Sequence, residues 1–233
     1  VSFSVQGEQY IDDVSILVNG KTYVPGGNKY SITAPLGSSV SITVTAKEGY
    51  AVTATASGNW TASGNSVSTT SLTSGGSISF TVAAKELHDI SASVSYVPGT
   101  TQSGAYISTD PSQAREGETV TVTVSLDGGL KVRSISGGAG VELKQISSSS
   151  SNYVRYTFIM PDRDVQITAE IEKTTYSVTA APSLHGKVEL DVGYGKDPKA
   201  LEYGDWVEVY ATPAYGYYLK ALKLNGNSVT FSG

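Results

Sequence analysis

The chain contains the stretch Gly204-Asp205-Trp206-Val207-Glu208-Val209-Tyr210-Ala211-Thr212-Pro213-Ala214-Tyr215-Gly216-Tyr217. Two earlier copies of this pattern begin at Gly37 and Gly117. In every copy the first valine lies three residues after the opening glycine, and a second glycine lies twelve residues after that opening glycine. Because glycine adopts turn conformations that other residues avoid, the two glycines predict a strand with a turn at each end. We refer to the three copies as the repeat strands.

Apolar residues occupy alternate positions of each repeat strand, and alternate side chains of a strand share one face. The other face is rich in serine and threonine in the first two copies. An apolar face opposite a polar one is typical of an antiparallel sheet with one side in water. We therefore predict an all-β fold in which the apolar faces form the core. These faces are Val40, Ile42, Val44 and Ala46, then Val120, Val122 and Val124, then Val207, Val209 and Ala211.

The repeat strands divide the chain into modules, because their opening glycines are 80 and 87 residues apart. We predict a divergent β module over residues 1–87, a second module over 88–173 and a third over 174–233. The second module ends with a hairpin that closes at Ile171, and the third has no counterpart of it before Gly233. We therefore expect the third module to be C-terminally incomplete. Each module is predicted to be a small antiparallel β-sandwich or a β-grasp-like unit, and the modules to form an elongated array.

Local signals place further elements. Asn19-Gly20 between apolar runs predicts a two-residue hairpin. Asp, Pro, Ala and Gly fall at matching positions of residues 110–117 and 197–204, which predicts a short helical turn in both modules. Residues 136–152 predict a flexible loop. Other strands are expected at residues 1–5, 14–18, 30–33, 51–56, 78–82, 90–96, 106–107, 156–160, 165–171, 176–180, 187–192 and 219–224.

Composition excludes several classes of function. The chain has no cysteine, which rules out disulfides and thiolate sites, and its formal net charge is −5. Nucleic acid and anionic membranes attract basic patches, so we expect neither as a partner. No apolar run is long enough for membrane insertion. The chain begins at Val1, and we expect it to be a piece of a longer protein. We expect this piece to be monomeric and to need no cofactor and no metal.

The end of the second module carries the clearest motif, Tyr156-Thr157-Phe158-Ile159-Met160-Pro161-Asp162-Arg163-Asp164-Val165-Gln166-Ile167-Thr168-Ala169-Glu170-Ile171. Together with the repeat strand, this run resembles the divergent internalin-B-type B-repeat. The third module resembles the same family through Ala211-Thr212-Pro213 and Gly216-Tyr217, and the first lacks the Met-Pro-Asp turn. The resemblance implies a tandem all-β unit of bacterial cell-surface and secreted proteins, hence a protein exported to the cell surface or beyond. It implies no shared catalytic residues.

Few residues are candidates for chemistry. His88 and His185 are the only histidines, and we expect both to lie in exposed loops. The carboxylates of Asp162 and Asp164 could ligate calcium, but in this Pro-Asp turn we favour local hydrogen bonding. No paired acids define a cleft, so we expect no enzyme activity.

The third repeat strand replaces serine and threonine on its outer face by Trp206, Glu208 and Tyr210. Aromatic rings beside acceptors stack on sugars and are enriched in protein interfaces. One hypothesis is a non-catalytic spacer or display stalk, in which these rings pack against a loop or the second module. The alternative is an adhesive module that binds a glycan or a host or cell-surface protein through them. A third hypothesis is an accessory region of an enzyme.

Overall fold

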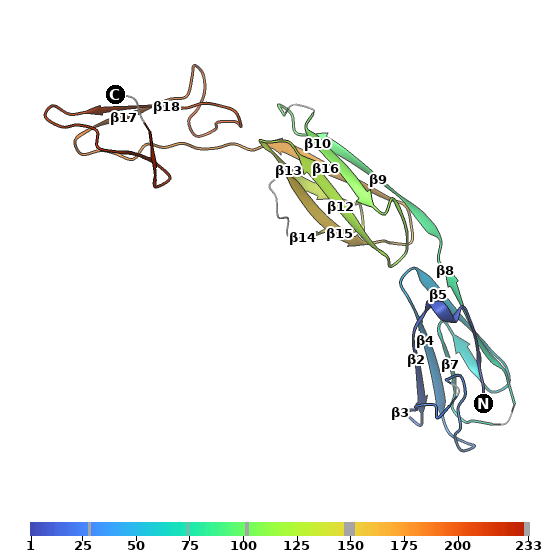
Figure 1. Ribbon diagram of the computed structural model, residues 1–233. Coiled ribbons are helices and arrows are strands. Elements are labelled where there is room, and N and C mark those ends of the chain that lie inside the picture. The colour runs from blue at the N-terminus through green and yellow to red at the C-terminus, as the bar shows by residue number, and fades with distance from the viewer. Residues whose placement is uncertain (28, 74, 101–102, 147–151, 231–233) are drawn as a thin grey trace.

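The structure is a computed structural model that describes residues 1–27, 29–73, 75–100, 103–146 and 152–230. Its regular structure is almost entirely β. Within the described ranges the only helical element is one 3-10 turn, η1 (Glu8–Tyr10). The sheets fall into three groups that follow one another along the chain and lie end to end in a bent row (Figure 1). The all-β prediction is confirmed.

The second module is a sandwich of two four-stranded sheets, β10-β12-β15-β14 and β11-β9-β16-β13. The repeat strand β12 places Val120, Val122 and Val124 in the core at 0% exposure. From the facing sheet, Ile167 and Ile171 of β16 are equally buried. The strands are β9 (Leu87–Tyr96), β10 (Ala105–Asp110), β11 (Gln113–Arg115), β12 (Thr119–Leu126), β13 (Leu130–Ser136), β14 (Lys144–Ile146), β15 (Tyr153–Ile159) and β16 (Val165–Lys173).

The first and last strands of this module are parallel neighbours, with Val165 opposite Ile90 and Ile171 opposite Tyr96. This differs from the purely antiparallel sheets that alternation predicted. The turn after β15 carries the chain from one sheet to the other, so β16 enters beside β9 and runs in the same direction. The remaining pairs of both sheets are antiparallel.

The first module has the same strand order as the second. Its sheets are β3-β2-β4-β7-β6 and β1-β8-β5, and β1 and β8 are again parallel. Thus β2, β4, β7 and β6 take the places of β10, β12, β15 and β14, while β1, β8 and β5 take those of β9, β16 and β13. The strands are β1 (Ser4–Gln6), β2 (Ile11–Val18), β3 (Lys21–Thr22), β4 (Val40–Ala46), β5 (Tyr50–Ala56), β6 (Thr61–Ser63), β7 (Ser66–Thr69) and β8 (Ile78–Ala84).

The third module is much sparser. It contains β17 (Gly186–Asp191), β18 (Glu208–Pro213), β19 (Leu222–Leu224) and β20 (Asn227–Val229). The β17–β18 pair corresponds to β10–β12, but no strand among the described residues corresponds to β15 or β16. Val209 is consequently 40% exposed. The prediction of a buried apolar face is therefore right for the first two repeat strands and wrong for the third, which has no opposing sheet.

Several local predictions need correction. Residues 110–117 form no helical turn, because Gln113–Arg115 pairs with β9 as β11. In residues 197–204 the Asp197 carboxylate accepts the N–H of Lys199, and a single turn closes there without a helix. Residues 30–33 and 176–180 make only isolated bridges, Ser2–Ser31 and Tyr176–Leu201. The predicted loop 136–152 contains β14, and its Ser147–Ser151 run lies outside the described residues.

The Asn19-Gly20 hairpin is confirmed. Asn19 has φ 50° and Gly20 has φ 74°, and they connect β2 to β3. These positive angles match the two-residue turn that follows the twist of paired strands. Asn225 and Gly226 repeat the geometry between β19 and β20, with φ 47° and 83°.

Neighbouring modules meet in a similar way at both junctions. A lysine at or just after the end of the last strand of one module pairs with a glutamate one or two residues before the opening glycine of the next repeat strand. The Lys85–Glu116 and Lys173–Glu202 pairs each have an N–O distance of 2.9 Å. The second glycine of the repeat strand also lies against the next module: a methyl group on Gly129 would come within 2.3 Å of the Tyr203 Cβ. The second repeat strand therefore starts near the first module and ends near the third.

Candidate functional site

Trp206 lies two residues before β18 and directly follows a tight turn at residues 202–205. The Asp205 carboxylate accepts the N–H of Glu202 at 2.8 Å and also contacts the Lys196 ammonium. These two contacts hold the pKa of Asp205 below its usual value, with the Lys196 contact as the larger cause. Asp205 therefore stays ionised near neutral pH and ties the turn together. The Trp206 indole lies near Gly193.

Acidic side chains surround the aromatic rings of this face. In the antiparallel pairing of β17 with β18, Tyr210 lies opposite Glu189 and Glu208 lies opposite Asp191. The Tyr210 hydroxyl donates a hydrogen bond to Glu208. That bond and the Glu208 charge raise the pKa of Tyr210 above its usual value. The face thus offers two rings beside hydrogen-bond acceptors, a combination suited to a neutral or cationic polar ligand.

The three residues predicted for the site, Trp206, Glu208 and Tyr210, lie along one exposed face. Trp206 is 58% exposed and Tyr210 is 53% exposed. Among the aromatic side chains of the third module, Tyr203 is the one that lies against the second module, over Gly128 and Gly129. The rings of the predicted site remain open to solvent. Whether they bind a ligand stays a prediction.

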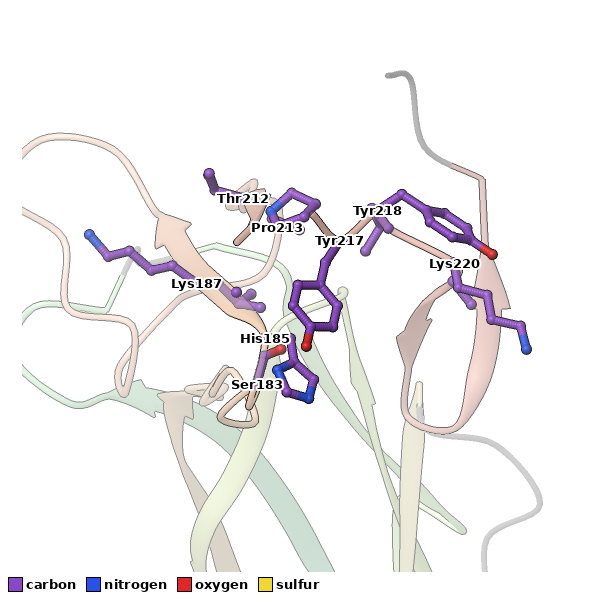
Figure 2. Close-up of a pocket in the computed structure, with 13 residues that line it drawn as sticks. Ser183, His185, Lys187, Thr212, Pro213, Tyr217, Tyr218 and Lys220 are labelled. Carbon is purple, nitrogen blue, oxygen red and sulfur yellow. The ribbon is translucent and has the colours of Figure 1, made fainter. Parts of the chain in front are cut away.

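A separate cavity of about 380 Å³ opens at the far end of β17 and β18 (Figure 2). The ring of Tyr217 stacks on the imidazole of His185, with centroids 4.2 Å apart and planes at 5°. Lys187 and Lys220 extend away from this stacked pair on either side (Figure 2). The lining contains no carboxylate that could orient His185 as a general base.

Sequence reasoning missed this cavity. His185 precedes β17 and Tyr217 follows β18, so only the pairing of the two strands brings the rings together. His185 is exposed outside the strands, as predicted.

His88 corrects the prediction of an exposed loop histidine. It lies in β9, its side chain is 13% exposed, and its Nε2 is 3.0 Å from Asp162 Oδ1. The Asp164 carboxylate accepts the N–H of Asp89 at 2.9 Å. These contacts tie the turn between β15 and β16 to the start of β9. Asp162 and Asp164 thus hold the turn through contacts with residues 74 and 75 positions earlier in the chain, and not through the local hydrogen bonds that the sequence predicted.

The described residues contain no group of three or more histidine, cysteine or carboxylate side chains placed to hold a metal ion. Within the same residues, no helix has the length and apolar character needed to cross a bilayer.

Comparison with known families agrees with the resemblance in the second module. Residues 93–175 match the family model of the divergent InlB B-repeat domain. The match spans β10 to β16 and the C-terminal part of β9 from residue 93 onward, including the Met160-Pro161-Asp162 turn. The resemblance of the second module to the InlB-type B-repeat is thereby confirmed. No curated protein and no solved structure gives a significant match to the chain.

Proposed function

We propose that this chain is a non-catalytic spacer or display stalk within the repeat region of an exported bacterial surface or secreted protein. The family match supports a surface repeat region, since the InlB B-repeat is a repeat domain that is generally non-catalytic. The observation that carries the spacer role is the repeated junction. Because both junctions place the end of one repeat strand near the start of the next, added modules would lengthen the array without folding it back.

The junctions also restrict bending. The Lys85–Glu116 pair and the Gly49–Glu118 approach connect the first and second modules. The Lys173–Glu202 pair and the Tyr203 ring connect the second and third. Exposed ion pairs are worth at most about 1 kcal/mol each, so they orient the modules more than they stabilise them. Such a spacer is extended and moderately stiff.

Small-angle X-ray scattering of residues 1–233 tests the spacer role. A compact protein of this length would have a radius of gyration of about 17 Å. We expect a clearly larger value and a pair-distance distribution with a long tail. A radius near that of the compact protein would contradict the proposal.

A second candidate function is adhesion through the outer face of β18. It is favoured by the exposure of Trp206 and Tyr210 beside the acceptor Glu208. The test is binding to a panel of glycans and host matrix proteins by the native chain and by a Trp206→Ala/Tyr210→Ala variant. Adhesion predicts binding that the double variant loses while circular dichroism shows an unchanged fold. The matched control is Tyr194→Ala/Tyr215→Ala, which removes two fully exposed rings outside this face.

Acrylamide quenching gives an inexpensive check on the exposed ring. Trp60 is 5% exposed and Trp206 is 58% exposed, so collisional quenching reports mainly on Trp206. A Trp60→Phe variant should therefore be quenched slightly more efficiently than the native chain. Weak quenching of that variant would show that Trp206 is covered and would remove the basis for adhesion.

A further inference from the structure

The two junctions between modules share one backbone arrangement. At the first junction, the N–H of Lys85 donates to the Gly49 carbonyl oxygen at 2.9 Å. At the second, the N–H of Thr174 donates to the Gly129 carbonyl oxygen at 2.7 Å. The second glycine of each of these repeat strands therefore holds the connection into the next module. The junctions differ in the side chains that cross them.

Charged side chains connect the first module to the second. The Lys85 ammonium lies 2.9 Å from a Glu116 carboxylate oxygen and 3.3 Å from the Glu116 carbonyl oxygen. A methyl group on Gly49 would come within 2.4 Å of the Glu118 carboxylate, so this carboxylate lies against the first module. Its other oxygen accepts the N–H of Arg115 at 2.7 Å. These four charged side chains are between 27% and 46% exposed, so dissolved ions can screen them.

An aromatic ring connects the second module to the third. The Tyr203 side chain lies over Gly128 and Gly129, where added methyl groups would come within 2.8 Å of its Cζ and 2.3 Å of its Cβ. The Lys173–Glu202 ion pair lies beside this contact. The contact of the ring with the glycines is apolar, so ionic strength screens only the ion pair at this junction.

The corner that follows each repeat strand at its second glycine also differs. In the first module the rings of Tyr10 and Tyr50 stack there, with centroids 4.1 Å apart and planes at 14°. The Tyr10 carbonyl accepts the N–H two residues before the second glycine, and the Gly104 carbonyl does the same in the second module. Gly104 therefore takes the place of Tyr10, and Leu130 takes that of Tyr50. The first module fills its corner with its own rings, whereas the ring at the corner of the second belongs to the third module.

The hydrophobic cores of the first two modules do not merge. Within the described residues, one cluster lies in residues 3–80 and the other in residues 90–171. We infer that the first junction is an ionic hinge, which loosens as ionic strength rises, while the Tyr203 ring keeps the third module fixed on the second. The reach of the array then depends on the salt around it. This property goes beyond the spacer role and does not depend on it.

Spin-label distances measure both junctions in the whole 233-residue chain, which has no native cysteine. Ser68→Cys with Lys144→Cys spans the first junction, and Lys144→Cys with Lys199→Cys spans the second. Raising the ionic strength from about 0.01 M to about 1 M shortens the Debye length from about 30 Å to about 3 Å. We expect the first distance distribution to broaden by about a factor of two and the second to keep its width.

Removal of charge separates the hinge from a general effect of salt. At low ionic strength, Glu116→Gln/Glu118→Gln should broaden the first distribution as high salt does. The matched control Glu142→Gln/Glu170→Gln removes two charges from the same module away from this junction and should leave the width unchanged. If circular dichroism shows that the Glu116→Gln/Glu118→Gln variant unfolds, Lys85→Gln replaces it, because Lys85 is the partner of Glu116.

The ring at the second junction has its own test. Tyr203→Ala leaves the Lys173–Glu202 pair as the side-chain link that remains, so the second distribution should become salt-dependent.

Four results would overturn the inference. They are a first distribution of equal width at both ionic strengths, equal broadening of both distributions by salt, equal broadening by the control variant, and a second distribution that stays independent of salt in Tyr203→Ala. The first would mean that the backbone connection alone orients the modules. The third would assign the effect to the net charge of the second module instead of to this junction. The second and fourth would mean that the Tyr203 ring does not hold the third module.

Discussion

The second and third modules carry the same repeat strand in different surroundings. In the second, Val122 is completely buried between two sheets; in the third, Val209 at the same position is 40% exposed. The alternation of apolar positions is equally regular in both repeat strands. The difference lies in β15, which pairs with the second repeat strand, and in β16 of the facing sheet; neither has a counterpart among the described residues of the third module. Alternation thus specifies which side chains face inward, and a separate strand determines whether that face is buried.

A charge at this shared position should separate the two modules most strongly. Val122→Asp buries an unpaired carboxylate, and we expect it to destabilise the second module by about 4 kcal/mol or more. Val209→Asp leaves its carboxylate in contact with water and should cost less than about 1 kcal/mol. Hydrogen exchange of β12 and β18 in the two variants measures this. Equal losses of protection would mean that Val209 is buried in solution and that the comparison fails.

The second glycines give the next largest contrast, because Gly129 lies against Tyr203 of the third module, whereas no described residue lies within 4 Å of a methyl group placed on Gly216. Both have positive φ, so alanine costs about 1 kcal/mol at either position. Only at Gly129 does the new methyl group collide with Tyr203, while the space around Gly216 is open. We therefore expect Gly129→Ala to shift the third module relative to the second.

Spin labels measure this shift directly, because the chain has no native cysteine to interfere. Cysteines at Lys144 and Lys199 place one label on each module. Gly129→Ala should change or broaden the distance distribution, and Gly216→Ala should leave it as in the parent. An unchanged distribution in both variants would show that the Tyr203 contact does not set the orientation.

Replacing the two histidines should give a smaller difference in stability between the second and third modules. His88→Ala removes the contact with Asp162 that ties the turn before β16 to β9, and should destabilise the second module by about 1 kcal/mol. His185→Ala removes only a stacked ring on an exposed tyrosine and should change stability by less than about 0.5 kcal/mol. Urea denaturation of the two variants measures both changes. A larger loss for His185→Ala would show that the cavity pair stabilises the third module.

The smallest expected difference between the two modules concerns the pKa values of two tyrosines. Burial raises the pKa of Tyr156 in the second module, whereas Glu208 raises the pKa of Tyr210 in the third. A raised pKa favours the neutral phenol in the folded state. Its contribution to stability is therefore present below the unfolded pKa and is lost as pH rises through the folded pKa.

NMR titration of ring-labelled tyrosine separates these causes. Glu208→Gln should lower the pKa of Tyr210 and leave that of Tyr156 unchanged. Asp191→Asn should lower the pKa of Tyr210 by a smaller amount, since Asp191 acts only through its charge. If the pKa of Tyr210 is unchanged in the Glu208→Gln variant, the hydrogen bond to Glu208 is not the cause of the raised pKa.

The sequence predicted the features that depend on near neighbours. Alternating valines located β12, and Asn19-Gly20 located its hairpin, because each signal needs only a few residues. Alternation places Trp206 and Tyr210 on the face away from the valines, but it leaves open whether a loop or the second module covers that face.

The failures all involve distant partners. The helical turn predicted at residues 110–117 is a strand because residues 87–89 pair with it. His88 is enclosed by a turn 74 residues further along the chain. The parallel pairing of β9 with β16, and the cavity between His185 and Tyr217, depend on how the chain crosses between strands. Local pattern carries no information about these contacts.

A pulling force along the chain enters the second module at β9 and leaves it at the end of β16. These strands are parallel neighbours over seven residue pairs, so tension slides one along the other and loads their hydrogen bonds together instead of opening them singly. The first module meets the same load with β1 and β8, which share three pairs. Under tension, the first module should therefore yield before the second.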